Sequence, residues 1–578
     1  MQKVCLTICF LIMGVVSLLA QNKMHFLQIS GSKNSDFIKQ AQQFKRLRFD
    51  DENTLSLKLE NLKSRFIEKG YLETSIDTSF RVNDTLYAVF HIGKPYTWDK
   101  LDLKIDSKAS SPHFDFSFTR GHHDGFTEVL DQQSRILDFY LNHAYPFASI
   151  TLSDIEIING EISGTCLLNP NQQVVWDSML IKGDACIHPK FIQNHLGIKQ
   201  GHAYSERKFE SITELMSKLD FISEIKASEL EFFEGKGRVH TYLKKQSANR
   251  FDGIVGFQSN KESDKLEFTG DVNLLLVNSF HRGERIRFNW RKLEENSQTL
   301  NLSFQYPYIF NSKFGTDFSF ELLKQDSTYL NINLRLGVNL KQNGNSEIKL
   351  FYQLKSSSLL STKQFAGLSV LPDYADSKSN LIGFEYQYEN LNRRYNPQRG
   401  WELKFEVAAG ENKIEKNLNI PEELYEGIEL KTKIFEGLLS LRNYLPIRSK
   451  WVYHWHIQGG WLERKNYFEN DLFRLGGMKS IRGFNEDAFR ASKYSILKQE
   501  FRFVPDRNTS IYLFMDLAWY KQEVHEKTYS DKPIGYGFGL NFSTGSGVFT
   551  LNYALGKQDG QSSDLKSAKI HFGFIAKF

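Results

Sequence analysis

The chain has 578 residues, a formal net charge of +5 and a 14 % share of aromatic residues. The length favours several domains, because one domain usually takes about 100–200 residues. The small net charge gives no reason to expect a nucleic-acid partner. So many aromatic residues, mixed with polar ones, suit alternating strands better than buried helices.

An apolar run lies at the start of the chain. Lys3 precedes the run Val4–Leu19, and Ala20 is a small residue of the kind found at cleavage sites. This pattern is typical of a secretory signal peptide, which we assign to residues 1–20. No later apolar run is long enough for a spanning helix, so a mature form embedded in a membrane must be a closed barrel.

Two of the four cysteines follow the signal peptide. These are Cys166 and Cys186. An exported protein meets an oxidising compartment, so a disulfide between them is one expectation, and two unpaired buried thiols are the other.

A repeat occupies the first half of the chain. EKGYLETSI (68–76), NHAYPFASI (142–150) and KLDFISEIK (218–226) correspond to one another. Each copy belongs to a unit that begins with a strand, continues with helical segments and ends with two strands. The sequence therefore predicts three small α+β modules, at 24–95, 96–174 and 175–249.

Alternation of period two replaces helical periodicity after about residue 250. In YLNINLRLGVNL (329–340) every second residue is apolar, and SIYLFMDLAWY (510–520) repeats the scheme. Outward apolar and inward polar residues are typical of transmembrane barrels, and at about 20 residues per strand and turn we expect about sixteen antiparallel strands over 250–578. A large soluble all-β domain is the alternative.

The last strand of this barrel should pair with the first. KIHFGFIAKF (569–578) ends the chain, and the first strand lies near FDGIVGF (251–257). Glycines loosen a strand, so this seam is predicted to be the weakest in the barrel. The residues that we assign to it are Gly253, Gly256, Gly573 and Phe578.

A long loop, LFRLGGMKSIRGFNEDAF (472–489), lies between two predicted strands. Alternation places Glu500 and Asp516, on the two strands that follow, on the inner face. Two inward carboxylates can bind the planar fork of Arg482. Glycines 476, 477 and 483 allow the loop to fold back into the barrel. A solvated arginine in an external loop is the alternative.

The segment LGGMKSIRGF (475–484) resembles the Arg-Gly-Phe loop of the BamA/TamA-type outer-membrane assembly factors, here Arg482, Gly483 and Phe484. The resemblance implies that the arginine docks on Glu500 and Asp516. The repeats look like POTRA domains. Three of them make the layout more similar to TamA than to BamA.

The resemblance implies a non-enzymatic protein, without cofactor or metal, in the outer membrane of a Gram-negative-type bacterium. Its POTRA domains would lie in the periplasm and receive unfolded outer-membrane proteins, with accessory subunits from the periplasm or inner membrane. The seam would assist insertion into the lipid bilayer. The alternatives are a two-partner-secretion translocator and a passive channel.

Three histidines recur at intervals of seven residues, at His188, His195 and His202. We expect them at the ends and on the surface of a helix of the third module.

Overall fold

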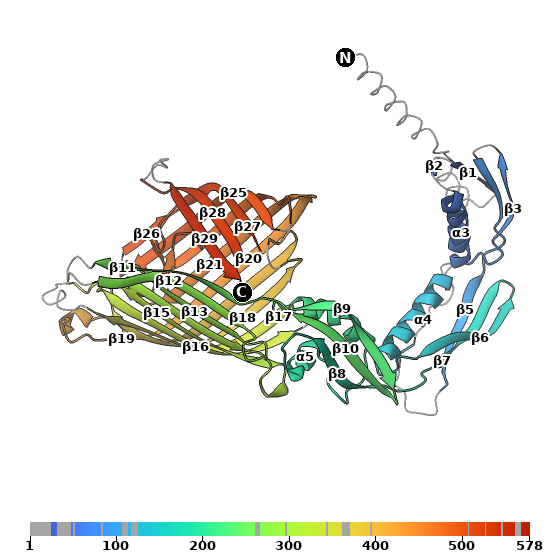
Figure 1. Cartoon of the computed structure of the whole chain (residues 1–578), viewed down its shortest axis with the longest axis horizontal. Helices are drawn as coiled ribbons and strands as arrows, with labels where there is room; N and C mark the ends of the chain where they lie inside the picture. Colours follow the sequence, from blue (N-terminus) through green and yellow to red (C-terminus); the bar gives the residue numbers. More distant parts are fainter. Residues whose placement is uncertain are drawn as a thin grey trace, which may run out of the picture. The chain divides into compact units, whose positions relative to one another are not determined.

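A computed structural model provides the fold (Figure 1). It describes residues 25–31, 48–49, 52–82, 85–106, 112, 114–116, 125–259, 266–294, 297–342, 345–360, 370–393, 396–506, 508–525, 527–544, 547–560 and 568–577. The predicted signal peptide lies outside these residues.

In the described part of the first module, helix α3 (Glu52–Glu68) packs on a sheet with the strand order β2-β1-β4-β3 (Figure 1). The strands are β1 (His25–Gly31), β2 (Arg48–Phe49), β3 (Ser75–Val82) and β4 (Thr85–His91). Leu59, Leu62 and Phe66 recur at helical spacing and are buried against Phe90 and Ile92 at the end of the sheet. This apolar stripe forms the core of the module.

The second module repeats this arrangement around α4 (Gly125–Leu141), with the strand order β5-β7-β6. The strands are β5 (Thr97–Ile105), β6 (Ser149–Ile158) and β7 (Glu161–Asn169). Strands β5 and β7 run parallel, whereas β6 is antiparallel to β7 and lies at one edge of the sheet that the described strands form. Val129, Ile136 and Tyr140 of α4 are buried.

The third module has the strand order β8-β10-β9 and short helices. Its elements are β8 (Val175–Gly183), α5 (Pro189–Leu196), α6 (Glu206–Glu210), α7 (Ile212–Ser217), β9 (Ile222–Phe233) and β10 (Lys236–Lys245). His188 caps α5 by accepting from the amide of Lys190, and Gly197 ends it in the left-handed conformation.

None of the helices in the described part of the chain is both long enough and apolar enough to cross a membrane.

The remaining strands close into an antiparallel barrel, as predicted (Figure 1). They are β11 (Arg250–Ser259), β12 (Leu266–Val277), β13 (Arg285–Glu294), β14 (Ser297–Tyr306), β15 (Phe314–Gln325), β16 (Tyr329–Gln342), β17 (Ser346–Leu359), β18 (Asp376–Leu391), β19 (Gly400–Glu415), β20 (Lys431–Arg448), β21 (Trp451–Arg464), β24 (Lys493–Phe503), β25 (Thr509–Val524), β26 (Lys527–Asp531), β27 (Ile534–Ser543), β28 (Gly547–Lys557) and β29 (Lys569–Lys577). Strands β26 and β27 pair one after the other along β25 and so occupy one position in the barrel wall. The seventeen described strands therefore fill sixteen positions around the barrel.

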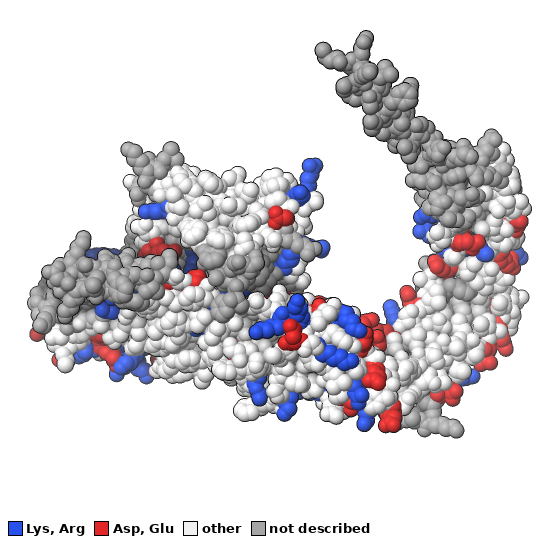
Figure 2. Space-filling view, viewed as in Figure 1, with Lys and Arg blue, Asp and Glu red and all other residues white. Residues whose placement is uncertain are grey.

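Side chains alternate along the barrel strands between a lipid-like outer face and a polar inner face. On β16, Leu336 and Val338 are exposed outward, whereas Gly337 and Asn339 are buried inside. Figure 2 shows that the outer face over β27 and β28 carries few charges in this view. An apolar outer band is what a bilayer requires of a barrel.

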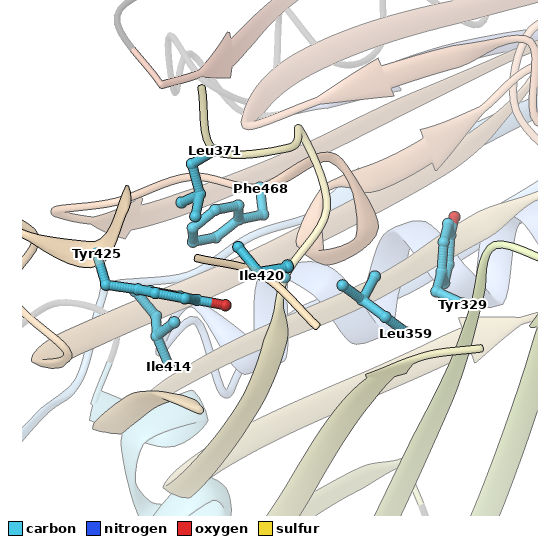
Figure 3. Packing of buried hydrophobic residues seen from close by; sticks show 8 residues of the cluster. Tyr329, Leu359, Leu371, Ile414, Ile420, Tyr425 and Phe468 are labelled. Carbon is cyan, nitrogen blue, oxygen red and sulfur yellow. The ribbon is translucent and has the colours of Figure 1, made fainter. Parts of the chain in front are cut away.

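A cluster of buried apolar residues joins the loops at one rim of the barrel (Figure 3). Phe468, from the loop before β22 (Phe473–Leu475), lies beside Leu371 and Ile420, which come from two other loops. Tyr425 and the end of β19 at Ile414 complete the contact. The three loops therefore pack together over this end of the barrel.

Candidate functional site

The loop between β21 and β24 folds into the barrel. A short hairpin of β22 and β23 (Phe489–Ala491) supports it. Ile481 is fully buried, and it packs with Leu475 and Phe489 of the loop against Ile496 and Ala518 of the barrel wall. Burial of this apolar set holds the loop inside the lumen and brings the next residue, Arg482, to the wall.

Arg482 binds both predicted carboxylates. Its Nη1 donates to Glu500 Oε1 at 2.7 Å, its Nη2 donates to Asp516 Oδ1 at 2.6 Å, and its Nε donates to Asp516 Oδ2 at 2.8 Å. The main-chain amide of Arg482 also donates to Asp516 Oδ2 at 3.0 Å. All three residues are buried. A guanidinium fork that holds two carboxylates fixes position and orientation together.

Three further side chains complete this site. The alternation of the sequence between inner and outer faces does not predict their contacts with the loop or with Glu500. The Phe514 ring lies 3.7 Å from the Arg482 guanidinium carbon, as a cation–π contact. Arg502 donates to the second oxygen of Glu500 at 2.7 Å. Lys498 donates to the main-chain oxygen of Lys479 in the loop at 2.6 Å. The loop is thus held by its backbone as well as by Arg482.

The loop approaches the wall so closely that only glycine fits at two points. At Gly483, which has φ 92°, a Cβ would lie 2.5 Å from the main chain of Leu555. On the wall, a Cβ at Gly535 would lie 1.9 Å from the main-chain oxygen of Arg482. A Cβ at Gly556 would lie 2.7 Å from the main-chain oxygen of Gly483 and 2.9 Å from the ring of Phe484. Gly476 and Gly477 also have positive φ.

A second group of buried charges lies on the opposite half of the strand order, across β15 to β19. Arg335 donates to Glu406 at 2.6 Å and lies over the Phe351 ring at 4.1 Å. Lys349 lies 3.2 Å from Asp317 and 3.3 Å from Glu385. No local sequence motif predicts this group, because its members are spread over five strands.

Apolar side chains also point inward and fill part of the lumen. Leu381 is fully buried, and Ile434 and Leu462 are almost so, together with Leu472 of the loop. These contacts make the interior resemble a protein core. In the described part of the chain, no group of three or more His, Cys, Asp or Glu residues is arranged to hold a metal ion.

The seam between the first and last strands is short. Among the described residues, strand β11 has ten register pairs with β12 and two with β29, namely Arg250↔Lys577 and Phe251↔Ala576. Neither Gly253 nor Gly573 belongs to these two seam pairs; Gly253 pairs with Val272 of β12, and Gly573 with Thr550 of β28. Gly256 lies in β11, and Phe578 lies outside the described residues.

The disulfide expectation was wrong, and both cysteines are free. Cys166 is fully buried on the central strand of the second module, and Cys186 is exposed just after β8 of the third. The alternative of two buried thiols therefore holds only for Cys166.

His195 does not lie on the surface of its helix as predicted. Its Nδ1 lies 3.0 Å from the Tyr308 hydroxyl, in the turn between β14 and β15, and its Nε2 lies 2.9 Å from the Leu215 main-chain oxygen. Phe191, on the same helix, contacts the Tyr308 ring as well. The helix therefore docks on a barrel turn through His195.

The sequence matches the Omp85 superfamily domain over residues 278–578. The chain belongs to the Omp85 superfamily. The match covers the strands from β13 to the end, including the Arg482 loop and both of its acidic partners. Omp85 barrels are bacterial outer-membrane proteins, and the three N-terminal α+β units resemble POTRA domains. No curated protein matches the chain.

Two solved structures of CdiB share the fold of this Omp85 protein at low identity, and a structure of BamA matches more weakly. CdiB from Acinetobacter baumannii has a TM-score of 0.52 and 14 % identity over 91 % of this chain and 98 % of its own. CdiB from Escherichia coli has a TM-score of 0.52 and 12 % identity, and the match covers 91 % of this chain and 97 % of the CdiB chain. BamA from Haemophilus ducreyi lacking POTRA domains 1–3 has a TM-score of 0.44 and 13 % identity, and the match covers 84 % of this chain and 100 % of the BamA chain.

Proposed function

We propose that this protein inserts other proteins into the outer membrane, and that its β11–β29 seam opens sideways to receive them. The short seam is the observation that carries this proposal. Two register pairs hold β29 to β11, whereas ten hold β12 to β11. The unpaired backbone along the rest of β11 is a template for a client strand.

The N-terminal modules would lie in the periplasm and bind client proteins there. Strand β6 is an edge strand, and its Ile155 and Ile157 are exposed by 54 % and 52 %. An extended client adds to such an edge by main-chain hydrogen bonds, with apolar contacts alongside. Whether the layout is nearer to TamA than to BamA stays a prediction, as do the domain boundaries at 95, 174 and 249.

The groups that occupy part of the lumen argue against the two alternative functions, a passive channel and a passenger translocator. A passive channel needs a continuous water path, and a passenger translocator needs a path wide enough for a chain. Here the Arg482 loop and the apolar side chains around Leu381 and Leu472 occupy part of the interior. Transport through the lumen would have to expel a loop that buried ion pairs hold in place.

A disulfide across the seam tests the proposal. Phe251→Cys with Ala576→Cys joins the two strands at a native register pair, in a background where Cys166 and Cys186 are serine. Oxidation should stop the insertion of a client barrel into proteoliposomes, and reduction should restore it. Full activity of the oxidised protein would refute sideways opening.

A matched disulfide on the opposite wall provides the control. Ile382 and Ala409 are register partners on β18 and β19, which share sixteen pairs and form a continuous wall. Ile382→Cys with Ala409→Cys should leave insertion unchanged after oxidation. A translocator would instead export a passenger normally with the seam locked, and would lose export only when the lumen is blocked.

A further inference from the structure

A row of polar side chains crosses the inner face of the first four barrel strands at one level. Register pairing places Asp252 of β11 opposite Asn273 of β12, Asn273 opposite Asn289 of β13, and Asn289 opposite Asn301 of β14. Facing side chains of neighbouring strands are the closest contacts that a sheet offers. Four residues far apart in the sequence therefore lie side by side around the lumen.

The amides of this row hydrogen-bond in a single direction, toward β11. Asn301 Nδ2 donates to Asn289 Oδ1 at 3.1 Å, and Asn289 donates in turn to Asn273 Oδ1. Asn273 Nδ2 then donates to Asp252 Oδ2 at 2.9 Å. An ionised carboxylate only accepts, so Asp252 fixes the orientation of Asn273, and each amide fixes the next. Such a polarised chain strengthens its own bonds.

A second carboxylate supports the end of the row. Asn273 Nδ2 also donates to Asp271 Oδ1 at 3.0 Å, and Arg291 Nε holds the other oxygen of Asp271 at 2.9 Å. Arg291 thereby neutralises Asp271 and orients it toward Asn273. The bond from Asn273 to Asp252 is left as the charge-assisted link between β12 and β11.

Strand β11 needs such a link more than the other strands do. Within the described residues it shares ten register pairs with β12 and two with β29. It also carries two glycines, and glycine-rich strands slip in register easily. Asp252 is the one acidic residue of β11. A slip of one residue would place Phe251 or Gly253 opposite Asn273, and a slip of two would place Arg250 or Ile254 there.

We infer that Asp252, Asn273 and Asn289 are positioning residues that set the register of β11 on β12. This inference rests on the proposed function, because a fixed register of β11 fixes which of its backbone groups a client strand meets. A client pairs with the free edge of β11 while the row of amides holds the other edge in place. Strand β11 can then exchange β29 for a client strand while it stays paired with β12.

Cysteine pairs measure this register directly, without any client. Phe251→Cys with Leu274→Cys joins native partners, whereas Phe251→Cys with Leu276→Cys or Val272→Cys joins only a strand that has slipped by two residues. In a background with serine at the native cysteines, the native pair should oxidise readily. The two slipped pairs should oxidise little, because partners two residues apart lie too far apart for a disulfide.

Asn273→Leu removes the row while keeping the size of the side chain. We expect the slipped disulfides to increase about tenfold, which corresponds to about 1.4 kcal/mol. Asp252→Asn keeps the shape but removes the charge, and should give a smaller increase in the same direction. Ser303→Ala, at the next inward position of β14 after Asn301, is the control and should change nothing.

Equal slipped cross-linking in Asn273→Leu, Asp252→Asn and the parent would overturn the inference. Variants are compared only as folded barrels, judged by their heat-dependent mobility on gels. If the row of amides only stabilised the barrel, its loss would lower the heat stability, and residue 251 would still cross-link to residue 274 and not to residue 272 or 276. The result is also separate from the proposed function, because a seam disulfide without effect on insertion would leave the register measurement standing.

Discussion

The main-chain oxygen of Arg482 lies so close to Gly535 that a Cβ on residue 535 would come within 1.9 Å of it. The wall of the barrel therefore accepts the loop only because residue 535 has no side chain. Backbone cannot yield as a flexible side chain can, so the contact constrains the loop as strictly as the ion pairs do.

Gly535→Ala should consequently unseat the loop. We expect a loss of about 1–3 kcal/mol in stability, the usual cost of overpacking, together with a loss of client insertion. Protease cleavage within 472–489 should increase. Gly459→Ala is the matched control, because its Cβ would meet its nearest atom only at an ordinary 3.6 Å. Cleavage that is equal in both variants would contradict a constraint at residue 535.

Replacement of Arg482 by alanine should cost more. It leaves Glu500 and Asp516 buried without their shared cation, and removing one partner of a buried pair typically costs about 3–5 kcal/mol. Urea unfolding of the refolded barrel measures this loss. Arg482→Lys should recover only part of it, since an ammonium cannot bind both carboxylates as a fork does.

Two further variants separate charge burial from simple loss of contacts. Adding Asp516→Asn to Arg482→Ala should restore stability relative to Arg482→Ala alone, because it removes a buried charge. Lys465→Ala in the same loop breaks an exposed pair with Glu429, in which Lys465 is 66 % exposed, and should cost at most about 1 kcal/mol. Similar losses for Arg482→Ala and Lys465→Ala would argue against a buried lock.

The sequence predicts the barrel and its inner face well, because a period of two assigns every residue to one face. Glu500 and Asp516 follow from that rule. The contact of Phe514 with Arg482 does not, since it depends on how the loop approaches the wall. The Arg335 and Lys349 group needs the register of five strands, and the row from Asp252 to Asn301 needs that of four, which no local pattern provides.

The sequence also does not predict which residues pack against a given side chain. A spacing of seven residues places His188 and His195 on one helix but does not say what covers either of them. His195 meets Tyr308 because a barrel turn happens to lie there. Likewise a cysteine count allows a pairing of Cys166 with Cys186 but cannot place the two thiols in space.

Phe468→Ala should loosen the loops that pack together at the rim of the barrel (Figure 3). Phe468 is only 1 % exposed, and loss of a buried phenylalanine usually costs about 3–5 kcal/mol. We expect faster protease cleavage of the loop at 416–430. Leu418→Ala is the control in that loop, because Leu418 is fully exposed. Unchanged cleavage in Phe468→Ala would mean that the loops are held by other contacts.

Acid should weaken the contact between α5 and the turn at Tyr308. Burial lowers the pKa of His195 from 6.5 to about 4; its bond to Leu215 opposes this shift, while Lys341 and Lys218 add to it. An opened contact takes up a proton below pH 6.5, whereas the closed one does not. The contact is therefore fully stable above pH 6.5 and loses up to about 3 kcal/mol as the pH falls to 4.

Hydrogen exchange of residues 189–196, corrected for intrinsic rates, measures this opening. Between pH 7 and pH 4.5 the parent should lose protection in α5, because the protonated imidazole cannot accept from Tyr308 and is poorly solvated in its buried position. His195→Gln does not titrate and should show a flat profile. His188→Gln, at the exposed N-cap of α5, should keep the pH dependence of the parent. The same dependence in His195→Gln would assign the effect to another group.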